Sequence, residues 1–235
     1  ALGPDIPKQD GSGDFETLSR QAGDLAVIFR DNTYSPQALS GIRSLINVQG
    51  APAYNPFRIA LNFEHILSGH RDEANNFRPR HGPYHLKEHA DGRSIIFERE
   101  AEDSPWEIGS RMTVTPAAGN ALDFTFTCSP RSVKKLGSHR YAVLFWANYL
   151  NPVPNIDLHF RGVEVEGAAE DWMAVEAPAS DVVHRNGGSY RHRDARRLPI
   201  DADHNVPWNV SSYDWPRFTL PMFYGRTERN MTLIL

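Results

Sequence analysis

The side chains best suited to proton transfer include three that recur at every second position. Asp157, His159 and Arg161 alternate with apolar residues of a predicted strand, so they point to one face of a sheet. The unperturbed pKa of histidine lies near neutrality, and a neighbouring charge can tune it. His159 is therefore a candidate general acid or base in the wall of a site, with Asp157 or Arg161 setting its pKa. The alternative is a solvent-exposed face without a site.

A second group of such residues surrounds Glu64. Strand-like alternation puts Asn62 and Glu64 on one face, whereas His65 shares the other face with apolar residues. Glu64 is a candidate general base or hydrogen-bond acceptor beside Asn62, and His65 fits a hydrogen-bonded core histidine. His70 and His204, which lie in polar segments, are the substitute candidates for acid–base catalysis.

A divalent metal is the alternative occupant of the histidine-rich segments. Glu64, His70 and a later histidine could supply ligands, but their spacing matches no zinc signature such as H-E-x-x-H. Asp201 and Asp203 could bind calcium, but the EF-hand pattern is absent. The chain also lacks GxGxxG, P-loop, G-x-S-x-G and CxxC motifs. We therefore expect no cofactor, and a metal-dependent enzyme stays a rival hypothesis.

Arginine and aromatic side chains are the candidate groups for orienting a substrate. Arg80 lies in a proline-containing loop and offers a planar fork of donors, unless that loop is merely solvated. Tyr213 and Trp215 lie near carboxylates and amides, and such rings suit the apolar face of a sugar, unless Trp215 anchors a loop in the core. The complete predicted binding set is Asn62, Arg80, Trp106, Asp157, Arg161, Tyr213 and Trp215.

The elements that position these residues are predicted to be strands. Alternating or continuous apolar segments indicate strands at 57–65, 94–99, 111–115, 122–128, 141–149, 156–160, 218–224 and 231–235. Residues 25–29 fit a strand or part of a helix over 15–30. Residues 141–149 are almost continuously apolar, as in a central strand covered on both faces. We expect a mainly β protein with an antiparallel β-sandwich and few short helices.

The chain is expected to form one domain with two long polar loops. Residues 1–14 are rich in glycine and proline and predict a flexible arm, and residues 15–235 predict a single sandwich domain. The polar loops at 67–92 and 177–216 flank the central strands, and loops on a rigid sheet often carry binding groups. Because the sequence stops within an apolar segment, we expect the natural chain to continue beyond Leu235.

Composition excludes several classes of partner. The net charge of −4 provides no basic field for nucleic acid. No segment approaches the ~20 apolar residues of a membrane-spanning helix. The single cysteine, Cys128, excludes an intrachain disulfide, and its place in an alternating segment predicts a buried, small apolar residue. The oligomeric state is not indicated.

Several stretches, in this order, resemble a group of uncharacterised bacterial extracytoplasmic proteins with a galactose-mutarotase-like supersandwich. They are Leu61–His65, Ser104–Trp106 followed by Asp123–Cys128, Tyr141–Asn148 with His159–Gly162, and Pro221–Gly225. This fold is shared by aldose epimerases, some polysaccharide lyases and non-catalytic domains of glycoside hydrolases. The resemblance implies a periplasmic or secreted protein that binds a sugar or oligosaccharide on a concave sheet face. It implies either epimerase- or lyase-like proton transfer or a non-catalytic carbohydrate-binding module.

Overall fold

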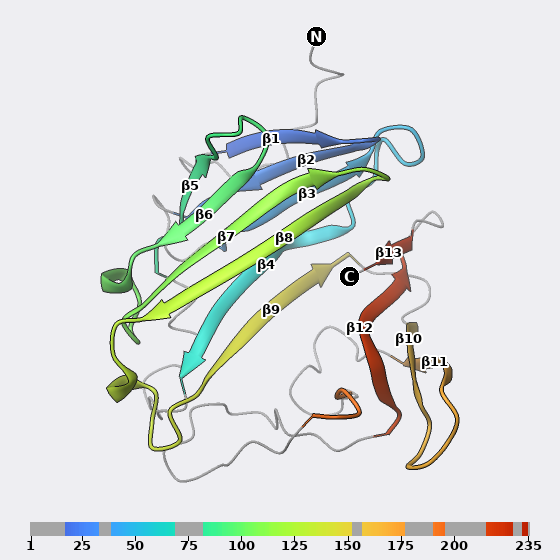
Figure 1. Ribbon diagram of the computed structural model, residues 1–235. Coiled ribbons are helices and arrows are strands. Elements are labelled where there is room, and N and C mark those ends of the chain that lie inside the picture. Colours follow the sequence, from blue (N-terminus) through green and yellow to red (C-terminus); the bar gives the residue numbers. More distant parts are fainter. Residues whose placement is uncertain are drawn as a thin grey trace.

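Antiparallel strands dominate the computed structural model. It describes residues 17–32, 39–68, 82–151, 157–176, 190–195, 215–227 and 232–234. Of residues 58–68, 145, 147–149 and 176 only the backbone is described. The strands form three sheets, here named A, B and C (Figure 1). The expected mainly β, antiparallel fold is confirmed. The predicted arm at 1–14 lies outside the described residues.

Sheet A has five strands in the order β1-β2-β3-β4-β9. They are β1 (Thr17–Ala22), β2 (Leu25–Arg30), β3 (Gly41–Asn47), β4 (Phe57–Ser68) and β9 (Ala142–Leu150). β1 and β2 form a hairpin whose turn contains Gly23 at φ 59°, a conformation that glycine adopts without steric cost. The strand alternative for residues 25–29 is therefore correct, and the helical one is wrong.

Sheet B has four strands in the order β5-β6-β7-β8. They are β5 (His85–Glu88), β6 (Ile95–Arg99), β7 (Ile108–Ala117) and β8 (Ala121–Pro130). Every second side chain of β7 is buried, as expected for a strand with one face on a core. The turns of the two sheets also meet, because the Asn120 side chain accepts a hydrogen bond from the Asp24 amide at 2.7 Å.

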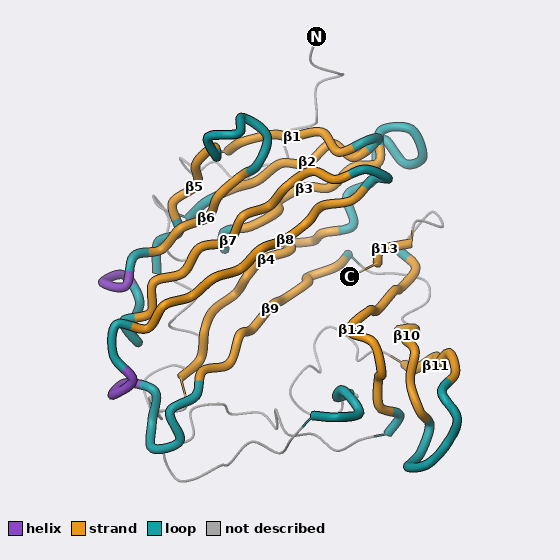
Figure 2. Tube along the Cα trace, in the orientation of Figure 1, coloured by secondary structure: helices purple, strands orange, loops and turns teal. Residues whose placement is uncertain are grey.

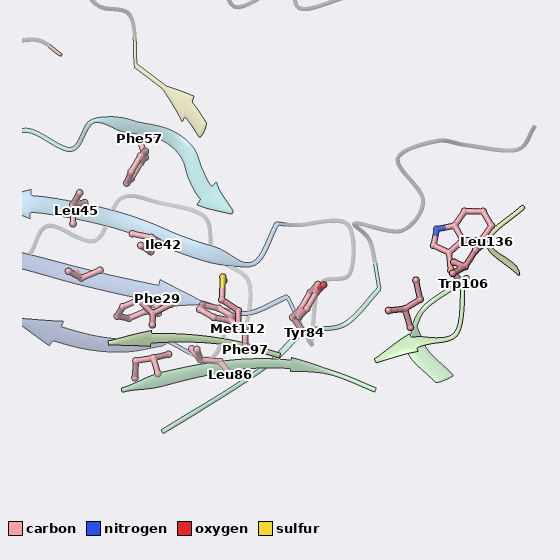
Figure 3. Packing of buried hydrophobic residues seen from close by; sticks show 14 residues of the cluster. Phe29, Ile42, Leu45, Phe57, Tyr84, Leu86, Phe97, Trp106, Met112 and Leu136 are labelled. Atoms are coloured by element: carbon pink, nitrogen blue, oxygen red, sulfur yellow. The ribbon is translucent and has the colours of Figure 1, made fainter. Parts of the chain in front are cut away.

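Sheets A and B enclose the main hydrophobic core. Most members of the buried cluster come from β2, β3 and β4 on one side and from β5, β6 and β7 on the other. Phe29 and Phe97 illustrate the contact between the layers, with ring centroids 6.2 Å apart (Figure 3). The sandwich predicted from the alternating strands is thus formed by the first two sheets.

Sheet C has four strands in the order β11-β10-β12-β13. They are β10 (Asp157–Val163), β11 (Asp171–Glu176), β12 (Arg217–Arg226) and β13 (Thr232–Ile234). One face carries an apolar cluster centred on Phe160, whose ring contacts those of Tyr190, Phe218 and Phe223. Leu233 of β13 packs against the core of the sandwich and so connects sheet C to it.

Two expectations about exposure are wrong. β9 was expected to be a central strand, but among the described residues it lies at the edge of sheet A, and Leu144 is 53% exposed. Cys128 was expected to be buried, but it is exposed on the edge strand β8. An apolar sequence pattern predicts that a segment is a strand. The exposure of its side chains depends on which elements lie beside that strand.

Four strands were not expected from the sequence: β1, β3, β5 and β11. β5 falls inside the segment 67–92, which was expected to be a loop, and β4 extends into that segment as far as Ser68. The described helical segments are the 3-10 turns Ala101–Asp103 and Val133–Lys135, which Figure 2 shows in purple. No described helix has the length and apolar character needed to cross a membrane.

Candidate functional site

The second face of sheet C presents aromatic and charged side chains. On β10, His159 and Arg161 point away from the face that carries Phe160 because side chains alternate along a strand. The register places His159 opposite Tyr224 of β12 and Arg161 opposite Trp172 of β11. Three strands therefore contribute neighbouring side chains to one surface.

The rings on this face contact one another directly. The His159 imidazole is stacked on the Tyr224 phenol ring, with centroids 4.7 Å apart and an interplanar angle of 11°. Trp172 meets Tyr224 edge-on, at a centroid distance of 5.5 Å and an angle of 70°. Trp172 is nevertheless 48% exposed. We call His159, Trp172 and Tyr224 the aromatic platform.

Arg161 lies at the rim of the aromatic platform. Its guanidinium donates from Nε to Glu170 Oε1 at 3.2 Å, and it lies 3.9 Å from Asp171 Oδ1. The guanidinium carbon is also 5.8 Å from the centre of the Trp172 ring. The hydrogen bond from Arg161 lowers the pKa of Glu170. The rim thus combines a fixed cation with ionised carboxylates.

A wide bulge in β12 shapes the strand behind this rim. Phe160 pairs with Phe223 and Gly162 with Phe218, so residues 219–222 of β12 face the single residue Arg161. This insertion contains Pro221, which has no N–H to donate and is tolerated at a bulge. The Thr219 hydroxyl donates to the Arg161 carbonyl at 3.1 Å and replaces a lost ladder bond.

The predicted site residues on sheet C are only partly brought together. Asp157 begins β10, two residues before His159, and it pairs with Glu176 of β11. Trp215 precedes β12 and is half-buried under Arg217, whose guanidinium carbon lies 3.9 Å above the ring centre. Trp215 is therefore occupied by a cation on one face, and no described contact connects it to the aromatic platform.

Trp106 does not belong to a surface site. It is 5% exposed and is a member of the sandwich core, where Figure 3 shows it beside Leu136. Its indole Nε1 is buried without a hydrogen-bond partner. Because the ring is enclosed by the core, it is not available to stack on a sugar, and we remove it from the predicted binding set.

The proposed acid–base pair of Glu64 and His159 is divided between two sheets. Asn62 and Glu64 lie on β4 of sheet A, where Asn62 pairs with Ala147 of β9, whereas His159 lies on sheet C. The side chains of Asn62 and Glu64 are outside the described part of the structure. Four further predicted residues also lie outside the described residues: His70, Arg80, His204 and Tyr213.

Trp172 and Tyr224 were missed by the sequence reasoning. Trp172 lies on β11, a strand that was not expected, and Tyr224 was noted only as part of a strand and of the resemblance. The spacing within one strand reveals which residues share a face, but the register between strands decides which faces join. No pattern in this sequence specifies the pairing of β10 with β11 and β12.

No cluster of three or more histidine, cysteine, aspartate or glutamate side chains suited to a metal ion occurs within the described ranges. Comparisons of the chain with protein-family models, with curated protein sequences and with solved structures found no significant match.

Proposed function

We propose that this protein binds a carbohydrate on the face of sheet C that carries the aromatic platform. The observation that carries the proposal is the geometry of Trp172, which is half-exposed, held edge-on by Tyr224 and flanked by Arg161. An exposed ring can stack on the apolar C–H face of a pyranose while charged groups at its rim bind the hydroxyls. Both requirements are met within one patch of three strands.

The platform is held in place by contacts inside the protein. Tyr224 is fixed between His159 and Trp172, and Arg161 is oriented by Glu170. Side chains that are already ordered lose less conformational entropy when a ligand binds, which improves affinity without further contacts. This organisation favours a binding surface over a merely solvated face.

The charges at the rim favour a neutral sugar. Arg161 is countered by Glu170 at 3.1 Å and by Asp171 at 3.9 Å, so its positive charge is already neutralised inside the protein. An acidic sugar would meet these carboxylates and lose affinity through repulsion between like charges. The resemblance to the galactose-mutarotase-like superfamily supports a sugar ligand and a periplasmic or secreted location.

The first experiment is a thermal-shift screen with neutral and acidic oligosaccharides, followed by calorimetric titration of those that raise Tm. We expect neutral oligosaccharides to stabilise the folded state. Trp172→Ala should weaken binding at least about tenfold, which corresponds to about 1.4 kcal/mol. Trp146→Ala, a tryptophan on β9 of sheet A, is the control and should keep the affinity of the wild type. Absence of binding by every sugar, or equal affinity of Trp172→Ala, contradicts the proposal.

Proton transfer on the bound sugar is the second candidate function. It is supported by His159, the residue of the platform that can act as acid or base near neutral pH. Epimerisation or β-elimination would both use such a group. If the protein turns over a sugar that binds, His159→Gln should abolish turnover while binding persists. Unchanged turnover would remove His159 from the mechanism and leave a binding module.

A further inference from the structure

Strand β8 lies at an edge of sheet B in the described part of the chain. Among the described strands it pairs only with β7, and Figure 1 shows it as the outermost strand of that sheet. An edge strand leaves every second N–H and C=O group without a partner in the sheet. The sequence of β8, ALDFTFTCSP, contains no lysine or arginine, and its proline stands at the last position. Asp123 is thus the one charge within the strand that opposes pairing of this edge with another chain.

The side chains of β8 are also incompletely covered. On the face toward the core, Leu122 and Phe126 are only partly buried, Phe124 is 37% exposed and Cys128 is exposed. Phe124 meets Trp146 of β9 edge-on, at a centroid distance of 5.1 Å, and Trp146 is also partly exposed. An apolar row thus continues to the open edge of the sandwich, where additional strands would bury it.

We propose that β8 pairs with β8 of a second copy of this chain, antiparallel and around a two-fold axis at Thr125. This register places Thr125 opposite the partner's Thr125 and Phe124 opposite the partner's Phe126. It also places Leu122 opposite the partner's Cys128. Aromatic and β-branched pairs of this kind stabilise neighbouring strands. The pairing joins the two copies of sheet B into one continuous sheet of eight strands, four from each.

The charges on the outer face are compatible with this register and with a second copy as the occupant. Glu98, Arg111 and Thr127 lie in one row across β6, β7 and β8. The two-fold axis at Thr125 places the partner's Asp123 next in that row, so the signs alternate across the dimer. No two like charges are directly opposed between the paired strands. A self-complementary strand is what a symmetric, isologous interface requires.

The first test is the oligomeric state by light scattering coupled to size exclusion over a range of protein concentrations. We expect a dimer for the wild type and a monomer for Thr125→Lys, because two lysines would oppose each other at the axis. Thr113→Lys is the matched control: Thr113 pairs with Thr125 from the interior strand β7, on the same sheet face, and this variant should stay dimeric. A monomeric wild type, or a Thr125→Lys variant that remains dimeric, overturns the proposal.

Thiol cross-linking tests the register. Opposed residues have Cβ atoms about 5 Å apart, so Leu122→Cys should form an intermolecular bond with the partner's Cys128 under mild oxidation. Asp123→Cys lies on the other face of the sheet and is the control that should not cross-link. Cross-linking of Phe124→Cys in place of Leu122→Cys would move the axis to Phe126 and overturn the register proposed. The β8 interface is on sheet B and the aromatic platform is on sheet C. The oligomeric state and the cross-linking result therefore do not depend on sugar binding.

Discussion

Arg99 is a charged side chain buried in the sandwich, with only 4% of its surface exposed. Its guanidinium carbon lies 4.0 Å above the Tyr84 ring, and its Nε donates to the Pro83 carbonyl at 3.2 Å. A second hydrogen bond goes from Nη2 to the carbonyl of Gly82. Burial lowers the pKa of Arg99. The ring contact and the two hydrogen bonds offset the free-energy cost of burying its charge. Arg99 therefore fixes the chain where it enters β5.

Replacement of this arginine should be costly. In Arg99→Ala the Pro83 carbonyl loses the bond from Arg99, the Gly82 carbonyl keeps only the one from Asn32 at 3.2 Å, and the ring of Tyr84 loses its cation. We expect the free energy of unfolding to fall by about 2–4 kcal/mol, measured by urea denaturation. Arg131→Ala removes an exposed ion pair with Glu102 and should leave the urea midpoint nearly unchanged. Similar urea midpoints for Arg99→Ala and the wild type would show that Arg99 makes no net contribution to the free energy of unfolding.

Gly162 allows the close approach of β10 and β12 at the bulge. A Cβ atom at this position would lie 2.5 Å from the Arg217 carbonyl oxygen and 3.0 Å from the Phe160 ring. Gly162→Ala should therefore lower the free energy of unfolding by about 1–3 kcal/mol and weaken sugar binding, because Arg161 would move. Gly225→Ala is the control on the same sheet, since the nearest described atom to its Cβ would be the Asp157 carbonyl oxygen, at 3.6 Å. Equal effects of the two substitutions on denaturation midpoints would contradict this interpretation.

At the scale of elements, a charged turn connects β5 to β6. Asp91 Oδ1 accepts hydrogen bonds from the amides of Arg93 and Ser94, both at 2.8 Å, and Oδ2 accepts from the Ser94 hydroxyl at 2.7 Å. These bonds, with the Ser94 amide contributing most, hold the pKa of Asp91 far below its ordinary value of 3.8. The ionised carboxylate therefore stabilises the turn above that pH.

This turn should make stability depend on pH. A carboxyl whose pKa is lower in the folded state contributes its full stabilisation above the unfolded pKa and loses it as pH falls. We expect Asp91→Asn to be less stable than the wild type at pH 7, and the difference to shrink below pH 3.8. Urea denaturation from neutral to acid pH measures this difference. A difference that stays constant with pH would show that the charge of Asp91 is not involved.

The strands with strict alternation were predictable, and their neighbours were not. β4, β8 and β10 lie where alternating segments predict strands, and that alternation depends on the local sequence alone. The shared face of His159 and Arg161 follows from the same rule. The platform itself also needs the register that brings Trp172 and Tyr224 beside them, and the bulge at Pro221 that shifts β12. Edge position, as in β9, similarly depends on pairing over long sequence distances.

At the scale of the whole molecule, the apolar side chains form two groups. One is the core between sheets A and B, to which Phe29 belongs, and the other is the cluster around Phe160 on sheet C. Leu233 is a member of sheet C that packs against the sandwich core. Local stability follows local burial, so two clusters that are connected through Leu233 among the described residues predict two cooperative units.

Deletion of a central ring from each cluster tests this division. Phe160 is fully buried, and replacement of such a residue by alanine typically lowers the free energy of unfolding by about 3–5 kcal/mol. We expect sheet C alone to be destabilised. By hydrogen exchange, we expect Phe160→Ala to remove protection from the amides of β10 and β12 while β2 and β7 keep theirs. Sugar binding should be lost together with the protection of sheet C, because the aromatic platform is on the reverse side of the same strands. Phe29→Ala should instead expose β2, β3 and β7. Equal loss of protection in all sheets of Phe160→Ala would show a single cooperative unit, in which the sandwich and the binding face cannot unfold separately.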